Sequence, residues 1–295
     1  MSYLRLDPPR VLPGISPRRR YTDWVMRGLL GLATLIALIP LVLILYFLVK
    51  RGVGQWSGKF FTTDPNGNFL GYPGGIRSAL LGTLEIVGLA TVIALPVGIG
   101  VALYLVEYGK SSRFAGLVRY FIDVMTGVPS IMFGLFIYIV LVLAHIGGTF
   151  AAWKGAVAIA LLMLPIVVRS AEVVLLLVPD SLREAALALG APRWRVVFRV
   201  VLPTAGPGLV TGSLLSIARG MGETAPLLFT IATATGLSAS LGQPMNTLPT
   251  QIFQDITSPR NAVVDRAWGA ALTLVVLVLI FNIVARLAAR RSRMS

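Results

Sequence analysis

The sequence of 295 residues contains no cysteine and a single histidine, His145. Without cysteine, the chain cannot form a disulfide, ligate an iron–sulfur cluster or present a thiol nucleophile. The histidine has no second histidine or carboxylate near it in the sequence, which argues against a metal site or a proton relay. We therefore expect no catalytic residue and no metal site on this chain.

Charged residues are also scarce. They make up 13% of the chain, while 56% of the residues are hydrophobic and the mean hydropathy is +0.82. Soluble domains carry about 25% charged residues, so this composition predicts a protein that crosses a membrane several times. The net charge is +14, and the basic residues lie mostly in tails and short loops. This distribution favours a role in membrane orientation over nucleic-acid binding.

Six apolar segments are each long enough to span a bilayer, which takes about 20 residues. Their approximate ranges are 28–49, 79–106, 115–144, 155–178, 204–232 and 268–288. We predict an all-α, polytopic membrane protein with six transmembrane helices. The predicted domain plan is a tail at 1–27, a transmembrane domain at 28–290 and a second tail at 291–295.

Lysine and arginine are divided unequally between the two sides that this plan creates. Seventeen lie in the two tails and in the segments 107–119 and 179–203, and seven lie on the opposite side. Because basic residues mark the cytoplasmic side, both termini and the loop 179–203 are predicted to be cytoplasmic. The outer segments 52–75 and 233–266 are predicted to be long connections that either receive a partner or are simply solvated.

The loop 179–203 contains a pattern typical of a short helix. Ser181 and Glu184 have the spacing of a capping box, in which each side chain bonds the other residue's backbone N–H. The small residues Ala185 and Ala186 follow, and Gly190 can take the left-handed conformation that ends a helix. Such a helix is too short to span, and it indicates a docking point for a cytoplasmic partner. The alternative is that Glu184 only caps the helix.

Two arginines, Arg169 and Arg219, lie inside apolar segments. A charge at mid-bilayer costs about 3 kcal/mol on insertion scales, so such a residue is a candidate for function. A guanidinium stays protonated and matches the oxygens of phosphate or carboxylate. Arg219 can pair with Glu223, and Arg169 with Glu172, at helical spacings, so each pair either serves the transport of a small oxyanion or only packs. Ser130 follows a proline kink and either donates to a passing anion or caps the backbone.

The segment Glu184-Ala185-Ala186-Leu187-Ala188-Leu189-Gly190, with Val200-Val201-Leu202-Pro203 after it, resembles the coupling loop of ABC importer permeases. That loop reads E-A-A-x3-G-x9-I-x-L-P, and the one departure is Val200 in place of isoleucine. Gly222-Glu223-Thr224-Ala225-Pro226-Leu227-Leu228 is similar to the signature of phosphate-specific permeases of the PstA type. Further similarities to that family extend from about residue 24 to residue 290, and they include Phe60-Phe61-Thr62, Gly74-Gly75-Ile76, Leu248-Pro249-Thr250-Gln251-Ile252 and Ala267-Trp268-Gly269-Ala270-Ala271.

The resemblance implies a type I ABC importer permease fold and a heteromeric phosphate importer in the plasma or inner membrane. The implied partners are a second permease of the PstC type, two ATPase subunits of the PstB type and an extracytoplasmic phosphate-binding protein of the PstS type. The chain lacks a Walker A loop, so we expect it to bind no cofactor, with ATP and Mg used by the ATPase subunits. The family's intramembrane charges correspond to Arg169, Arg219 and Glu223.

Three alternatives remain at this point. The same kind of permease could carry another oxyanion, such as sulfate, molybdate or tungstate. The chain could also serve as a scaffold that reports phosphate status to a sensor kinase, because the family's transporter is associated with such signalling. An intramembrane enzyme is disfavoured, since it would need a nucleophile, metal ligands or paired carboxylates in the spans.

Overall fold

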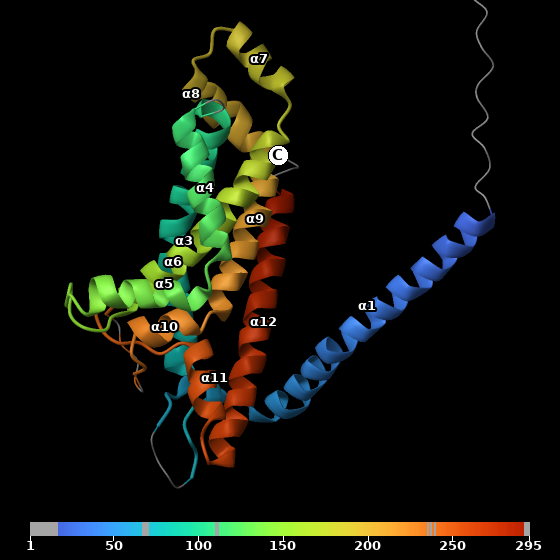
Figure 1. Ribbon diagram of the computed structural model, residues 1–295. Coiled ribbons are helices and arrows are strands. Elements are labelled where there is room, and N and C mark those ends of the chain that lie inside the picture. Colours follow the sequence, from blue (N-terminus) through green and yellow to red (C-terminus); the bar gives the residue numbers. More distant parts are fainter. Residues whose placement is uncertain are drawn as a thin grey trace, which may run out of the picture. The chain divides into compact units, whose positions relative to one another are not determined.

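The computed structural model describes residues 17–66, 71–109, 112–234, 236, 238 and 240–291 (Figure 1). Every regular element in these ranges is helical, apart from an isolated antiparallel bridge between Pro65 and Gly74, which confirms the all-α prediction. In chain order the elements are α1 (Pro17–Gly52), η1 (Val53–Gln55), α2 (Gly58–Thr62), α3 (Arg77–Leu103), η2 (Tyr104–Tyr108), α4 (Arg113–Gly127), α5 (Ser130–Ile137), η3 (Tyr138–Val142), α6 (Ala152–Leu176), α7 (Asp180–Ala188), α8 (Arg193–Val196), η4 (Val197–Val201), α9 (Leu202–Gly222), α10 (Ala225–Thr230), α11 (Leu248–Ile256) and α12 (Asn261–Arg291).

The chain divides into two units, residues 1–49 and 50–295. In the first unit, the described residues form most of α1, and nearly all of the apolar side chains from residue 29 onward are exposed. A helix that is apolar on all sides and has no core of its own is typical of a membrane span. The predicted tail at 1–27 lies partly outside the described residues, and its described part, from residue 17, continues into α1 without a break.

The second unit is built around α6, which packs against α3 and α9. Its main core cluster combines small residues, such as Ala90, Ala94 and Ala156, with larger ones such as Met163. Small residues let membrane helices approach closely. Gly98 shows how close the approach is, because a Cβ there would lie 2.6 Å from Cγ1 of Val167.

Five helical stretches in the described ranges are long and apolar enough to cross a membrane, and a bent pair makes a sixth. The bent pair corresponds to the predicted segment 115–144, whose expected continuity is wrong. The helix axis turns by 105° between α4 and α5. Val128 adopts an extended backbone (φ −75°, ψ 129°) because the following Pro129 disfavours the helical conformation there.

The predicted segment 204–232 is wrong at both ends. The span begins near Arg193, because α8, η4 and α9 form one helical stretch, so the predicted loop 179–203 is shorter than expected. The span ends at Gly222, where Glu223 takes an extended conformation (φ −76°, ψ 129°). The segment after it, α10, is a separate short helix with a proline in its first turn, a position that proline favours.

The outer segment 233–266 contains more structure than a connection. It includes α11, which a Thr247–Thr250 capping box begins, and the first turns of α12. Arg266 on α12 forms a buried ion pair with Asp255 on α11, with Nη2 and Oδ1 2.7 Å apart, and also donates to the backbone oxygen of Pro73. These contacts lie at the end of the unit opposite α7 (Figure 1).

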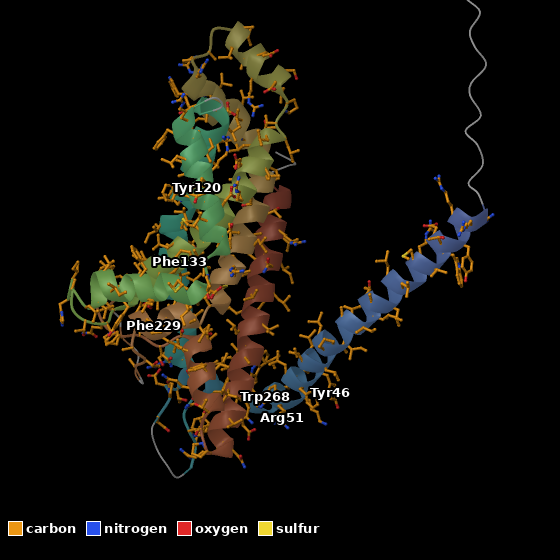
Figure 2. All side chains as sticks on the ribbon, in the orientation of Figure 1. Tyr46, Arg51, Tyr120, Phe133, Phe229 and Trp268 are labelled. Atoms are coloured by element: carbon orange, nitrogen blue, oxygen red, sulfur yellow. The ribbon has the colours of Figure 1, made fainter. Side chains whose placement is uncertain are left out.

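Aromatic residues also join elements of the second unit. The guanidinium of Arg51, at the end of α1, lies 5.3 Å from the ring centroid of Trp268 on α12 (Figure 2). Many large apolar side chains of this unit are exposed, among them Val92, Phe136, Leu215 and Leu279. So large an apolar surface requires lipid or another apolar protein around it.

Candidate functional site

A small cleft lies where several helix interruptions meet. It has a volume of about 90 Å³ and is lined by residues at the α4–α5 break, by α6 at Pro165 and by Arg219 of α9. Phe133 of α5, labelled in Figure 2, contributes part of the wall. Arg219 therefore lies beside the α4–α5 break of a neighbouring span.

Arg219 pairs with Glu223, as their spacing predicts. Its Nε lies 3.4 Å from Oε1 of Glu223, and the arginine side chain is 56% exposed against 15% for the glutamate. The contact is long for a charge-assisted hydrogen bond, which is usually about 2.7–2.9 Å. Arg219 consequently keeps much of its hydrogen-bonding capacity facing the cleft.

Ser130 is the first residue of α5, directly after the break. Its side chain is half-buried, and in the described part of the chain it forms no hydrogen bond that caps the helix. The predicted alternative of backbone capping is therefore absent from this structure. A hydrogen bond from the Ser130 hydroxyl to a passing anion stays a prediction.

Arg169 belongs to a cluster of four charges between α4 and α6. Its Nη1 donates to Oε2 of Glu172 at 2.9 Å, as the spacing predicts, and its Nη2 donates to the carboxylate of Asp123. Glu172 also accepts from Nε of Arg119 at 2.8 Å, and its side chain is only 8% exposed. The buried carboxylate is thus shared by two guanidinium groups.

Sequence reasoning missed the two members of this cluster on α4. Arg119 was counted as a basic residue of a cytoplasmic loop, and Asp123 received no role. Both lie in or beside an apolar segment at a spacing of four residues, which is the same signal that singled out Arg219 and Glu223. Arg169 and Arg219 lie at different levels of the bundle. Arg219 lines the cleft together with Pro165 of α6, and Arg169 lies four residues after Pro165 on the same helix, which corresponds to a rise of about 6 Å.

The short helix predicted in the cytoplasmic loop is α7, but the predicted capping box is wrong. The helix begins two residues earlier than that motif requires, with Pro179 instead of Ser181 at the N-cap and no side-chain cap. Asp180 occupies the first turn, so Ser181 lies within the helix instead of capping it. Gly190 does adopt the predicted left-handed conformation, with φ +78°.

Arg183 anchors α7 to the bundle. Its Nη2 lies 3.0 Å from Oε1 of Glu107 in η2, and each of these two side chains is 11% exposed. The guanidinium also donates to the backbone oxygens of Leu175 and Val178 and to Asp180. Sequence reasoning gave Arg183 and Glu107 no role, and their separation of 76 residues leaves no local pattern to detect.

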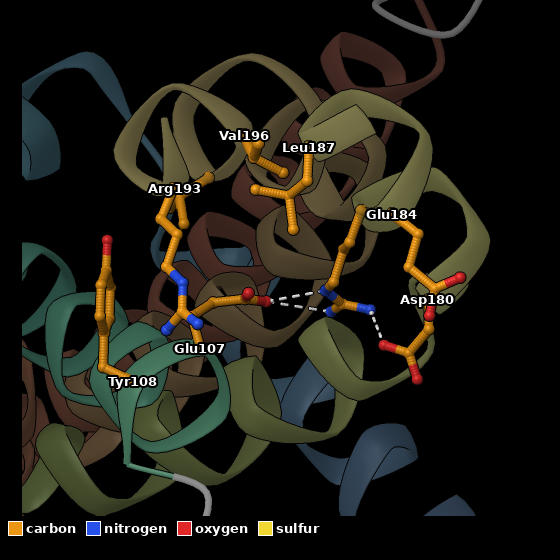
Figure 3. A pocket seen from close by; sticks show the side chains of 9 residues that line it. Glu107, Tyr108, Asp180, Glu184, Leu187, Arg193 and Val196 are labelled. Carbon is orange, nitrogen blue, oxygen red and sulfur yellow. Dashed lines mark hydrogen bonds and ion pairs between the residues drawn. The ribbon is translucent and has the colours of Figure 1, made fainter. Parts of the chain in front are cut away.

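A cavity of about 460 Å³ lies beside this anchor (Figure 3). Glu184 lines it together with Glu107, Tyr108 and Arg193. The outer face of α7 is exposed: Ala185 is open, Ala186 is half-buried, and Leu189 just beyond the helix is 90% exposed. An apolar side chain presented in this way beside a polar helix is suited to contact with another protein.

Comparisons with known proteins agree with this arrangement. The model of the family described as "Binding-protein-dependent transport system inner membrane component" matches residues 94–294. A solved bacterial ABC transporter for alginate import aligns with a TM-score of 0.63 and 16% identity, covering 93% of this chain and 98% of that one. The MetNI methionine ABC transporter aligns with a TM-score of 0.62 and 20% identity, covering 74% and 95%. Fold and site thus define the membrane-spanning component of a binding-protein-dependent transport system.

Curated relatives identify the branch of that family. Phosphate transport system permease protein PstA 1 of Mycobacterium tuberculosis is 40% identical over 97% of this chain and 94% of its own length. The PstA proteins of Haemophilus influenzae and Yersinia pestis are 40% and 42% identical over 91% and 87% of this chain. The chain belongs to the PstA family of phosphate transport system permeases.

Membership of this family settles several general properties. The chain is a multi-pass membrane protein and a permease subunit, not an enzyme. A permease of this class works with an ATPase and a substrate-binding protein. The fold prediction of an ABC importer permease is confirmed.

Proposed function

We propose that this chain is a permease subunit of an ATP-driven phosphate importer and forms half of the translocation pathway. The observation that carries the proposal is the identity of about two residues in five, over nearly the whole chain, to proteins named as phosphate transport permeases. The fold alone would not decide the cargo, because the structural neighbours carry methionine and alginate. The relatives favour phosphate over sulfate, molybdate or tungstate.

The pathway residues in this proposal are Arg219, Glu223, Ser130 and Arg169. Arg219 faces the cleft at the α4–α5 break and is held loosely by Glu223 at 3.4 Å. An incoming anion would compete with Glu223 for the guanidinium, which makes the pair a switch between an empty and an occupied state. Ser130 would donate its hydroxyl to the same anion, and Arg169 would provide positive charge at the next level.

The coupling residues are Ser181, Glu184, Ala185, Ala186 and Gly190, in the predicted loop 179–203. The proposal places α7 in contact with the ATPase, which supplies ATP and Mg, while this chain binds no cofactor. The exposed Leu189 and the small alanines support this contact, because they leave an apolar and sterically open face. Both termini and this loop would then be cytoplasmic.

We also propose the finer composition of the complex. A second permease of the PstC type would complete the pathway, two subunits of the PstB type would bind the coupling loops, and a binding protein of the PstS type would deliver phosphate from outside. The domain plan of a tail at 1–27, a permease domain at 28–290 and a tail at 291–295 belongs to the same proposal.

The test is uptake of radiolabelled phosphate in cells from which other phosphate importers have been deleted. Cells with and without this chain are compared, and unlabelled sulfate, molybdate and tungstate are added as competitors. We expect uptake to require the chain and to resist these competitors. Unchanged uptake after deletion, with the complex shown to assemble in the parent cells, would mean that phosphate is not the cargo.

A further inference from the structure

Arg183 forms the ion-pair attachment of the coupling helix α7 to the bundle, beside the apolar packing of Ala186. None of the residues of α7 is buried, whereas the side chain of Arg183 is only 11% exposed. Its guanidinium reaches the backbone oxygen of Leu175 at the end of α6, at 2.9 Å, and the carboxylate of Glu107, at 3.0 Å. Arg183 therefore provides a direct polar connection through which a force applied to α7 reaches the spans.

Arg119 forms a similar connection deeper in the bundle. Its Nε donates to Oε1 of Glu172 at 2.8 Å, and its Nη2 donates to the backbone oxygen of Leu105 at 3.0 Å. One guanidinium thereby joins three elements, α4, α6 and η2. Since Glu172 also binds Arg169, a shift of Arg119 changes the position or the charge environment of Arg169.

The two connections meet in η2. Leu105 and Glu107 lie two residues apart in this single π-helical turn, and Leu105 and Val106 are buried. Single π turns inside helices occur frequently at functional sites, because their backbone departs from the regular ladder. An unbroken series of contacts therefore runs from Arg183 through Glu107, η2, Arg119 and Glu172 to Arg169.

We propose that Arg183, Glu107 and Arg119 are positioning residues that carry a movement of α7 through η2 to Arg169. The inference rests on the proposed function, in which α7 docks on the ATPase. Energetic coupling between separated sites can travel along such chains of hydrogen bonds and ion pairs when they have discrete alternative arrangements. None of the three residues lines the cleft at Arg219, so they act through Glu172 and Arg169 and not on the cargo itself.

The test uses the complex assembled with its second permease and two ATPase subunits. Because this chain has no cysteine, Thr126→Cys places a single thiol of this chain at the cleft wall, where Thr126 is exposed. Its labelling rate with a maleimide is measured without nucleotide and after trapping with ATP and vanadate. We expect the two rates to differ by about fivefold or more, the lower range of typical allosteric coupling.

In this background, Arg119→Gln and Arg183→Gln should abolish the nucleotide-dependent difference while ATP hydrolysis continues. Arg119→Lys should give an intermediate difference, because an ammonium keeps the charge but lacks the fork that reaches Glu172 and Leu105 together. Arg113→Gln is the matched control, since Arg113 is exposed on α4 and contacts none of these groups, and it should leave the difference unchanged.

A double-mutant cycle separates a relay from a general loss of structure. If Arg183 and Glu107 act as one unit, the double variant Arg183→Gln with Glu107→Gln should reduce the nucleotide-dependent difference in labelling rate no further than either single variant does. Additive losses in the double variant would overturn the relay. It would also be overturned if the nucleotide-dependent difference in labelling survives Arg119→Gln, or if the parent complex shows no such difference. Absence of phosphate uptake with an intact reporter response would instead contradict the proposed cargo, because the labelling readout does not depend on it.

Discussion

Glu172 and Arg219 illustrate two ways in which this chain keeps charge among apolar helices. Glu172 is buried and bound by both Arg119 and Arg169, so its charge is offset twice. In the described part of the chain, Arg219 has one ion-pair partner, Glu223 at 3.4 Å, and its side chain is 56% exposed. The first arrangement is suited to holding helices together, and the second to exchanging a partner.

This difference predicts unequal costs of removing the two acids near Arg169. Glu172→Gln should destabilise the complex by about 3–5 kcal/mol, because removing one partner of a buried pair leaves uncompensated charge. Asp123→Asn should cost less, because the Asp123 side chain is 60% exposed and Arg169 keeps its ion pair with Glu172. Thermal unfolding of the detergent-purified complex measures both, and equal shifts in Tm would contradict this ranking.

The residue pairs show what the sequence could predict. Arg219–Glu223 and Arg169–Glu172 were predictable because each pair lies on one helix at a spacing of three or four residues. The contacts of Arg119 with Glu172 and of Arg183 with Glu107 join residues 53 and 76 positions apart, so only the packing of the helices brings them together.

At the scale of elements, long apolar runs predicted α3, α6 and α12 to within several residues. The breaks after Gly127 and Gly222 were not predicted, because apolar composition continues across both. The proline before Ser130 predicts a kink, but a kinked helix and a broken one share the same local signal. The capping box failed because α7 begins two residues too early for it, with Pro179 instead of Ser181 at the N-cap.

The position of α7 leads to a paired prediction about docking. Leu189→Asp should abolish or greatly reduce co-purification of the ATPase, because it places a charge at a position that is 90% exposed, beside the proposed docking helix. Ser181→Ala should leave the stability of the permease unchanged to within about 0.5 kcal/mol, because the Ser181 hydroxyl does not cap α7. Pull-down with the tagged permease measures the effect of Leu189→Asp and thermal unfolding that of Ser181→Ala, and a clear loss of stability in Ser181→Ala would restore the capping-box interpretation.

At the scale of the whole molecule, the helices separate two chemically different ends. In the second unit, the end with α7 and α8 carries exposed arginines, and the other end carries buried polar contacts of α11 with α12 and with the loop before α3 (Figure 1). By the positive-inside rule, the excess of basic residues at the α7 end predicts that this end is cytoplasmic, as the proposed topology requires.

This orientation can be measured directly because the chain is free of cysteine. Leu189→Cys should react with a membrane-impermeant maleimide only in inside-out vesicles, and Tyr72→Cys, at an exposed position of the outer segment, only in intact spheroplasts. The parent chain, without cysteine, is the control for background labelling. The reverse pattern would invert the proposed topology.

The most direct test of the central claim is phosphate uptake by Arg219→Gln in cells lacking other phosphate importers, with assembly verified by pull-down of the ATPase. We predict that the assembled variant loses uptake, while Arg113→Gln, which alters an exposed arginine away from the cleft, transports at the level of the parent. If the assembled Arg219→Gln complex takes up phosphate at the parental level, phosphate transport does not depend on this arginine. That result would contradict the proposed pathway.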